Sequence, residues 1–249
     1  MERMIAATEL CVRFGATKAL DDVGFAFPRG ALVAVVGPNA SGKSTLMRTL
    51  AGLIKPDEGS VEVMGLPLAR LSIESRAQAI AMVPQRPEVL ASFTAREVVA
   101  LGRYAAGPSS AAVAAALDAV GLAVRADVGC HALSGGERQR VAVARALAQV
   151  GEGSVLILDE PMAGVDPAEV ARMVQVLRDR AKTGAVLVTL HDAGLARAFA
   201  THALVLSRGR LVAAGDASET LTPEILSSAY GHPMEIRGGW IAPRLPPQR

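Results

Sequence analysis

Short, almost unbroken runs of apolar residues recur along the chain. They stand at residues 31–36, 80–83, 155–158 and 185–190. Continuous runs of this length are typical of strands that are buried on both faces of a parallel sheet. The chain is therefore expected to form an α/β fold around such a sheet.

Alternating apolar and polar positions flank these runs. Residues 10–14 and 23–27 alternate, and a short strand pattern follows at 60–64. This alternation predicts antiparallel strands, and thus an N-terminal antiparallel β subdomain. Residues 202–207 and 211–214 surround an Arg-Gly-Arg turn and predict a closing hairpin.

The pattern turns helical between about residues 88 and 133. Residues 95–101 and 111–120 predict two helices, which Gly-Pro-Ser-Ser separates. We therefore expect an inserted α-helical subdomain whose borders can act as hinges.

The end of the chain carries a helix start and then a tail. Thr222 and Pro223 predict the first turn of a last helix. One domain is expected over residues 1–235. The tail over residues 236–249 is rich in proline and arginine, and we expect it to be irregular.

Composition narrows the possible functions. A net charge of +2, from 26 basic and 24 acidic residues, gives no electrostatic signature of a nucleic-acid partner. Apolar residues make up 51% of the chain, yet no segment reaches the length of a membrane span. The apolar excess suits either packed helices or a surface that docks on another protein. Cys11 and Cys130 have no metal or disulfide spacing, and no signal-peptide core is present, so we expect a cytoplasmic protein.

The strongest motif is Gly-Pro-Asn-Ala-Ser-Gly-Lys-Ser-Thr at residues 37–45. It fits the phosphate-binding loop Gly-x-x-x-x-Gly-Lys-Ser, with a buried strand before it and a helical pattern after it. Gly37 and Gly42 let several backbone N–H groups face one point, where the helix dipole adds positive potential. Lys43 is expected to reach the outer phosphates and Ser44 to bind Mg²⁺. The loop therefore predicts a nucleoside triphosphate site.

A second helix start stands at residues 133–139, Leu-Ser-Gly-Gly-Glu-Arg-Gln. Ser134 and Glu137 predict a capping box for a helix that runs to about Gln149. The two glycines expose the first amides of this helix, so the segment is either a second anion site or only a well-capped helix. The capping box by itself favours the simpler interpretation.

Acidic residues follow the third apolar run. Ligands of parallel sheets bind beyond the carboxyl ends of the strands, where Asp159 and Glu160 emerge. Asp159 is expected to hold Mg²⁺, directly or through water, and Glu160 to activate a water molecule. His191 follows the fourth run in the same way, although a lone histidine there is more often structural.

With these motifs in this order, the chain resembles the ATP-binding subunit of an ABC transporter from residue 9 to about residue 236. Residues 133–139 resemble the ABC signature, and Asp159 with Glu160 resembles the Walker B acids. Gln85, Asp166 and His191 stand at the positions of the Q-loop, the D-loop and the switch histidine. Phe14 stands where an aromatic residue stacks on adenine, and Ala40 where glycine is frequent without being required.

The resemblance implies a P-loop NTPase (RecA-like) core that binds ATP and Mg²⁺ and works as a head-to-tail homodimer. The implied nucleotide contacts are Phe14, Gly37, Pro38, Asn39, Ala40, Ser41, Gly42, Lys43, Ser44, Thr45, Gln85 and Asp159. Catalysis would rest on Lys43, Glu160 and His191, and the metal on Ser44, Gln85 and Asp159. The partner chain would add Ser134, Gly135, Gly136, Glu137 and Asp166.

A finer resemblance is to importer ATPases for iron-siderophore, haem and cobalamin, through residues 93–104 and 221–231. It implies an integral-membrane permease that docks near Gln85 and the helical subdomain, at the cytoplasmic face of the inner membrane. A substrate-binding protein would be an indirect partner, and no nucleic acid would be bound. A soluble or exporter-type ABC ATPase is the alternative, although the former usually carries a coiled-coil insertion or a second ATPase unit.

Overall fold

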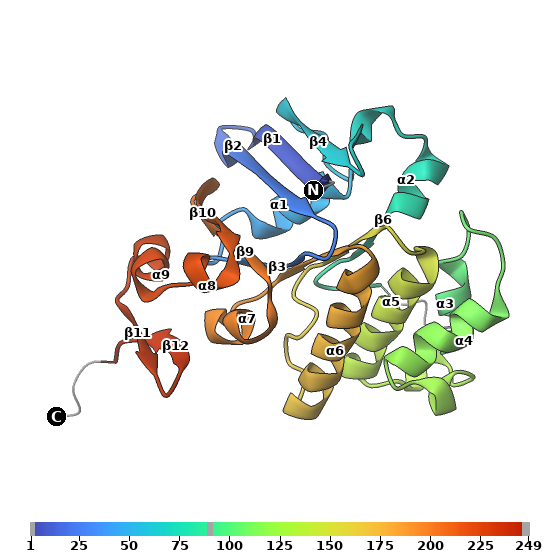
Figure 1. Ribbon diagram of the computed structural model, residues 1–249. Coiled ribbons are helices and arrows are strands. Elements are labelled where there is room, and N and C mark those ends of the chain that lie inside the picture. The colour runs from blue at the N-terminus through green and yellow to red at the C-terminus, as the bar shows by residue number, and fades with distance from the viewer. Residues whose placement is uncertain (1–2, 89–91, 246–249) are drawn as a thin grey trace.

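A six-stranded sheet runs through the middle of the structure, a computed structural model that describes residues 3–88 and 92–245 (Figure 1). In the order β10-β9-β3-β8-β7-β6, its strands are β10 (Arg210–Asp216), β9 (His202–Ser207), β3 (Leu32–Val36), β8 (Ala185–Thr189), β7 (Val155–Leu158) and β6 (Ile80–Val83). All neighbours are parallel except β9 and β10. The expected parallel sheet is confirmed, with the predicted hairpin at one edge.

A second, antiparallel sheet covers one face of the first. Its strands are β1 (Arg3–Phe14), β2 (Thr17–Pro28), β4 (Glu58–Val63) and β5 (Leu66–Pro67), in the order β2-β1-β4-β5. The first two are longer than the sequence pattern predicts. The reason is a set of register shifts, for example between Ala7 and Leu10, which interrupt the alternation while the pairing continues.

Helices lie in the connections between the strands. They are α1 (Lys43–Leu50), α2 (Ile73–Ala79), α3 (Ala95–Leu101), α4 (Ser110–Ala119), α5 (Gly135–Gln149), α6 (Pro167–Thr183), α7 (Ala193–Phe199), α8 (Ala217–Thr220) and α9 (Pro223–Tyr230). Short 3-10 turns are η1 (Leu68–Arg70), η2 (Ala123–Arg125) and η3 (Cys130–Ala132). Helices α3 and α4 lie beside α5, away from the antiparallel sheet (Figure 1). None of the helices in the described part of the chain is both long and apolar enough to span a bilayer.

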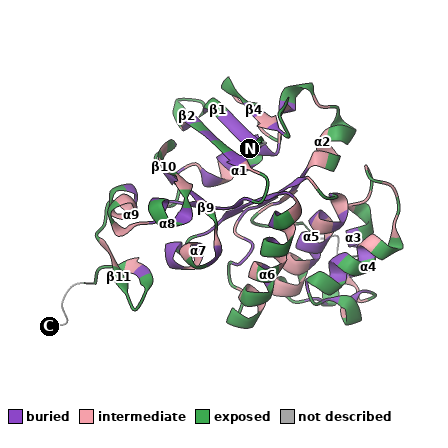
Figure 2. Cartoon of the chain, viewed as in Figure 1, coloured by how far each residue is buried: buried purple, intermediate pink, exposed green. Residues whose placement is uncertain are grey.

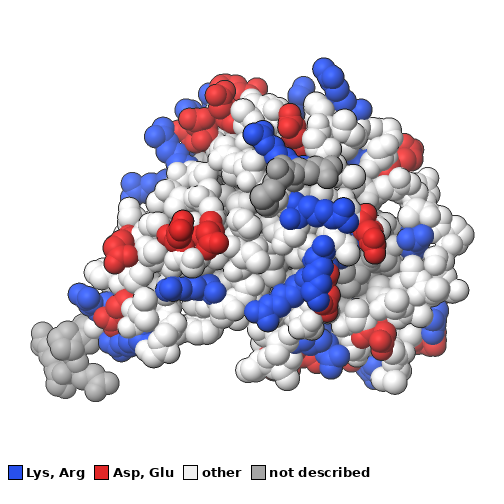
Figure 3. All heavy atoms as spheres, viewed as in Figure 1, with Lys and Arg blue, Asp and Glu red and all other residues white. Residues whose placement is uncertain are grey.

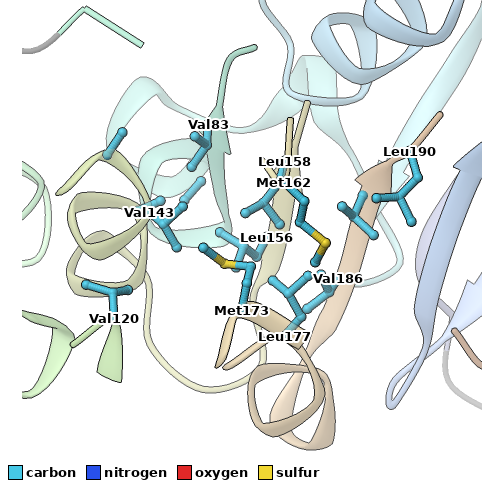
Figure 4. Packing of buried hydrophobic residues seen from close by; sticks show 14 of the residues in the cluster. Val83, Val120, Val143, Leu156, Leu158, Met162, Met173, Leu177, Val186 and Leu190 are labelled. Carbon is cyan, nitrogen blue, oxygen red and sulfur yellow. The ribbon is translucent and has the colours of Figure 1, made fainter. Parts of the chain in front are cut away.

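The central sheet separates two hydrophobic cores. Along β3, Leu32, Ala34 and Val36 belong to the core shared with α3 to α6, whereas Val33 and Val35 belong to the core shared with α1 and the antiparallel sheet. This alternation is why the strand is apolar on both faces. Figure 4 shows the first core, and Figure 2 shows the buried strands between exposed outer helices.

The predicted irregular tail is in part wrong. Strands β11 (Met234–Arg237) and β12 (Trp240–Pro243) pair in an antiparallel hairpin. The alternation is too short to predict a strand, and the hairpin depends on tertiary contacts, with Ile241 only 3% exposed. Residues 89–91 of the predicted insertion, and residues 1–2 and 246–249, lie outside the described residues.

Candidate nucleotide-binding and hydrolysis site

The loop after β3 takes a backbone path that its glycines make possible. Gly37 has φ 147° and Gly42 has φ 103°. A Cβ on Gly37 would lie 2.0 Å from the carbonyl oxygen of Leu206, and one on Gly42 would lie 2.5 Å from that of Ala19. Side chains are therefore excluded at both positions, and α1 begins directly after the second glycine.

Ala40 also has a left-handed backbone, with φ 58°. Glycine adopts this conformation freely, whereas steric repulsion destabilises it by about 1–2 kcal/mol in an L-residue with a side chain. The loop is closed around this residue, because Ser41 N donates to Pro38 O at 3.2 Å and Gly209 N donates to Ser41 O at 3.0 Å. The alanine thus fits the loop at an energetic cost.

Lys43 turns its ammonium group into the loop. Its Nζ donates to Gly37 O at 2.8 Å and to Pro38 O at 2.9 Å, and the residue is 5% exposed. Burial lowers the pKa of Lys43, and the nearby carboxylates of Glu160 and Asp159 partly offset that effect. The ammonium group therefore lies within the loop, against the carbonyl oxygens of Gly37 and Pro38.

A hollow of about 750 Å³ opens in front of this loop. Its lining residues are Thr17, Lys18, Ala19, Asn39, Ala40, Ser41, Gly42, Lys43, Ser44, Thr45, Gln85, Glu160, His191, Arg208 and Gly209. The structure thus brings Gln85, Glu160 and His191 to the phosphate loop from three different strand ends. Sequence reasoning missed the contributions of residues 17–19 and 208–209, because only the folded chain carries these turns to the loop.

Glu160 is held at the centre of a polar cluster. Gln85 Nε2 donates to Glu160 Oε2 at 2.6 Å, and His191 Nε2 lies 2.6 Å from Glu160 Oε1. The backbone of Glu160 is left-handed, with φ 51°, and its N–H donates to Thr189 Oγ1 at 2.7 Å. A strained backbone fixed from two sides gives the carboxylate a defined direction into the hollow.

Asp159 is almost completely buried, at 1% exposure. Its Oδ1 accepts from the Thr189 hydroxyl at 2.7 Å. The other carboxylate oxygen, the Ser44 hydroxyl and the Gln85 carbonyl oxygen are the oxygen donors that sequence reasoning assigns to Mg²⁺. Within residues 3–88 and 92–245, no three His, Cys, Asp or Glu side chains gather into a metal cluster. This sparse donor set suits Mg²⁺, which uses one or two carboxylates together with phosphate oxygens and water.

Residues 134–137 and Asp166 are not among the residues that line the hollow. Ser134 and Glu137 form the predicted capping box, with bonds of 3.2 and 2.8 Å, and accepting the Ser134 N–H lowers the pKa of Glu137. A Cβ on Gly135 would meet no atom within 4 Å, so the start of α5 faces open space. Asp166 caps α6 by accepting from Ala168 N and Glu169 N, each at 3.1 Å.

Phe14 ends β1 and is 55% exposed. It does not line the hollow, but it is the pairing partner of Thr17, which does. Phe14 therefore lies beside the turn that joins β1 and β2, next in the sheet to a residue that lines the hollow.

Comparisons with known proteins identify the family. Residues 20–163 match the family described as ABC transporter. The chain is 44% identical over 231 residues to "Hemin import ATP-binding protein HmuV" of Nocardia farcinica, which covers 89% of this chain and 78% of that protein. It is 41% identical over 231 residues to "Cobalamin import ATP-binding protein BtuD" of Halobacterium salinarum. This match covers 90% of this chain and 58% of that protein.

Solved structures give the same result. The ADP conformation of an ATP-binding cassette of an ABC transporter superposes with a TM-score of 0.79 at 26% identity, covering 92% of this chain and 98% of that one. A bacterial Atm1-family ABC exporter with ATP bound gives a TM-score of 0.78 at 29% identity. The superposed region covers 88% of this chain and 40% of the exporter chain.

Proposed function

The chain belongs to the ABC transporter family, and we propose that it is the ATP-hydrolysing subunit of an importer. It is an ATPase, and its relatives imply a membrane permease as the partner. The observation that supports the proposal best is the contact of Gln85 and His191 with Glu160 in front of the phosphate loop. This arrangement provides a general base where the outermost phosphate of ATP would lie.

The residues of the hollow have different roles in hydrolysis. The loop amides and Lys43 hold the phosphates, and Glu160 takes a proton from the attacking water. His191, bonded to Glu160, holds the γ-phosphate and keeps the carboxylate directed at that water. Ser44, Asp159 and Gln85 would hold Mg²⁺, which when bound neutralises charge on the phosphates.

Phe14 completes the nucleotide contacts of one chain. Its exposed ring can stack on the adenine of ATP. The observation in favour is its pairing with Thr17, which lines the hollow.

The second half of the site comes from another copy of the chain. Ser134 and Gly135 are exposed, and a Cβ on Gly135 would meet no atom within 4 Å, so a phosphate bound to a partner chain can approach this helix start. Gly136, Glu137 and Asp166 belong to the same shared surface. Two chains packed head to tail would therefore form two composite sites.

The permease would dock on an apolar surface beside β6. A hollow of about 360 Å³ is lined by residues that include Leu53, Ile73 and Met82. Leu53 is 69% exposed and Ile73 is 83% exposed, and Gln78 of α2 bonds to the carbonyl of Ala105 just after α3. The surface therefore joins the core to the inserted helices, next to the strand that ends before Gln85.

A charge introduced on this surface tests the docking proposal. Leu53→Glu and Ile73→Glu should each reduce co-purification with the permease, while ATP binding by the isolated subunit is unchanged. Val212→Glu is the matched control, since Val212 is also exposed but lies on β10 at the opposite edge of the sheet. Normal permease binding by both docking variants would contradict the proposed surface.

Haem, cobalamin or an iron chelate is the proposed cargo, because the two relatives described above carry hemin or cobalamin import in their names. The subunit would then act at the cytoplasmic face of the inner membrane, beneath a permease fed by a substrate-binding protein. An exporter or soluble role is the alternative. On the face seen in Figure 3, basic and acidic side chains are interspersed, which offers little to nucleic acid.

Reconstitution identifies the cargo and the direction of transport. The permease that co-purifies with this subunit is placed in liposomes, and ATP-dependent uptake of haem, cobalamin and a ferric siderophore is measured. Uptake of one of them is expected, with no uptake when the subunit carries Glu160→Gln. ATP-dependent movement in the opposite direction would favour the exporter.

A further inference from the structure

The carboxyl-terminal hairpin is attached to the body of the protein at two places beside the nucleotide site. Strands β11 and β12 pair only with each other, and an isolated two-stranded hairpin is marginally stable in water. Contacts with the rest of the chain must therefore hold it. Figure 1 shows it below α9 and near α7.

The first attachment joins Trp240 to Gly194. A Cβ built on Gly194 would lie 2.3 Å from Trp240 Nε1 and 2.4 Å from Cε2, so the indole lies directly against the backbone of α7. Helix α7 begins after Asp192, whose side chain accepts from Leu195 N at 3.0 Å. His191 immediately precedes this cap, so the indole contacts the helix that begins two residues after the switch histidine.

The second attachment joins Tyr230 to Gly37. The Gly37 N–H, the first amide of the phosphate loop, donates to the Tyr230 hydroxyl at 3.2 Å. Tyr230 is the last residue of α9, and the hairpin follows it after three residues. Burial raises the pKa of Tyr230, and the hydroxyl oxygen is the acceptor of this bond.

His191 stands between two hollows. It lines the nucleotide hollow, and it also lines a second hollow of about 470 Å³ whose other walls include Tyr230, His232 and Trp240. The side chain of His191 is 53% exposed. Its position therefore depends strongly on how α7 is held, because few side chains confine the ring.

We propose that residues 230–241 position the nucleotide site, with Tyr230 orienting the phosphate loop and Trp240 orienting His191 through α7. The proposal rests on the ATPase function and adds two positioning residues from outside the nucleotide-binding motifs. It implies that a change at Tyr230 or Trp240 alters hydrolysis although neither residue lines the nucleotide hollow. The two attachments also predict different kinetic effects, since one acts on the phosphate loop and the other on a catalytic group.

A double-mutant cycle tests the Trp240 attachment. Gly194→Ala places a methyl group where the indole lies and should displace it, and Trp240→Ala removes the indole. Each variant should lower kcat by about 10-fold through a misplaced His191, with the KM for ATP changed by less than about 2-fold. In the double variant the loss should be no larger than in either single variant, because the added methyl group then meets no indole.

Two controls separate positioning from general damage. Gly151→Ala makes the same chemical change at a glycine where a Cβ meets nothing within 4 Å, and Ile236→Ala trims an exposed residue of the same hairpin. Both should retain wild-type kcat. Losses that multiply in the double variant, or that follow a fall in the folded fraction measured by circular dichroism, would overturn the positioning role of Trp240.

Tyr230→Phe tests the other attachment. It keeps the ring and removes the acceptor of the Gly37 N–H, so the KM for ATP should rise about 5-fold, the effect of one hydrogen bond, with little change in kcat. An unchanged KM would overturn this half of the proposal. Neither result bears on the ATPase assignment, which Lys43 and Glu160 variants test separately.

Discussion

Gln85 and Glu160, separated by 75 positions in the chain, are joined by a hydrogen bond of 2.6 Å from Nε2 to Oε2. The two residues follow the carboxyl ends of β6 and β7, which are neighbouring parallel strands. Since β6 leads into the inserted helices, the bond connects the proposed general base to the part of the chain where the permease would dock. Movement of that part can therefore reach the base through a single side chain.

Glu160→Gln should leave ATP binding intact and reduce hydrolysis by about 10²-fold, the scale of a lost general base. The amide oxygen can still accept from Gln85 Nε2, and the amide nitrogen can donate to His191 when its Nε2 is unprotonated, so the side chain keeps its place while the basic oxygen is lost. Because ATP persists, ATP-loaded dimers should accumulate on a sizing column. Turnover near the wild-type rate would assign the base to another group, with His191 the first candidate.

Lys43→Ala should strongly weaken ATP binding, because the variant loses the charge that meets the outer phosphates. Lys43 also bonds to Gly37 O and Pro38 O, so part of the loss could come from a disordered loop. Lys43→Met retains the apolar stem and serves as the matched variant. Titration with a fluorescent ATP analogue should show weak binding for both, and wild-type affinity in either variant would contradict the phosphate-loop assignment.

Ala40→Gly should stabilise the protein. The left-handed backbone costs an alanine about 1–2 kcal/mol, whereas glycine adds about 0.4–1 kcal/mol of unfolded-state entropy. The net gain lies between about 0 and about 1.6 kcal/mol, and each 1 kcal/mol corresponds to a rise in Tm of about 2–4 °C. ATP binding should be unchanged.

Gly37→Ala is the opposing control in the same loop. Its methyl group would lie 2.0 Å from Leu206 O, so this variant should lose both stability and ATP binding. Thermal unfolding of the two variants compares them directly. A lower Tm for Ala40→Gly would show that the strain at Ala40 does not limit stability.

The sequence predicts those features that follow from local pattern. Continuous apolar runs locate the strands of the parallel sheet, and Ser134 with Glu137 locates the start of α5. Helix α2 is not predicted from the sequence, because it buries none of its residues and so shows no apolar face. Helix α6 begins with a start signal, Asp166 before Pro167, although no helix is predicted at this position above.

Features that depend on distant contacts could not be predicted. The Gln85–Glu160 bond requires β6 and β7 to be neighbours, and the sequences of these two segments do not determine the order of the strands in the sheet. The hairpin of β11 and β12 requires the bare backbone of Gly194 as a surface for Trp240. Arg208 reaches the nucleotide hollow only because β9 pairs with β3.

A final prediction separates a phosphate-binding role of Ser134 from simple helix capping. Aspartate is as good an N-cap as serine, so Ser134→Asp should leave the stability of α5 unchanged. Its negative charge would, however, oppose the γ-phosphate bound to the partner chain. Hydrolysis and ATP-driven dimerisation should both fail, while a single chain still binds ATP on its own loop.

The structure offers a matched control on another helix. Thr94 caps α3 with the same reciprocal bonds to Glu97 that Ser134 makes to Glu137. Thr94→Asp should therefore change the cap in the same way and leave hydrolysis at the wild-type rate. If Ser134→Asp and Thr94→Asp were equally active, Ser134 would be a helix cap and nothing more. A selective loss in Ser134→Asp, at equal Tm, requires an anion that approaches this helix start from outside the chain.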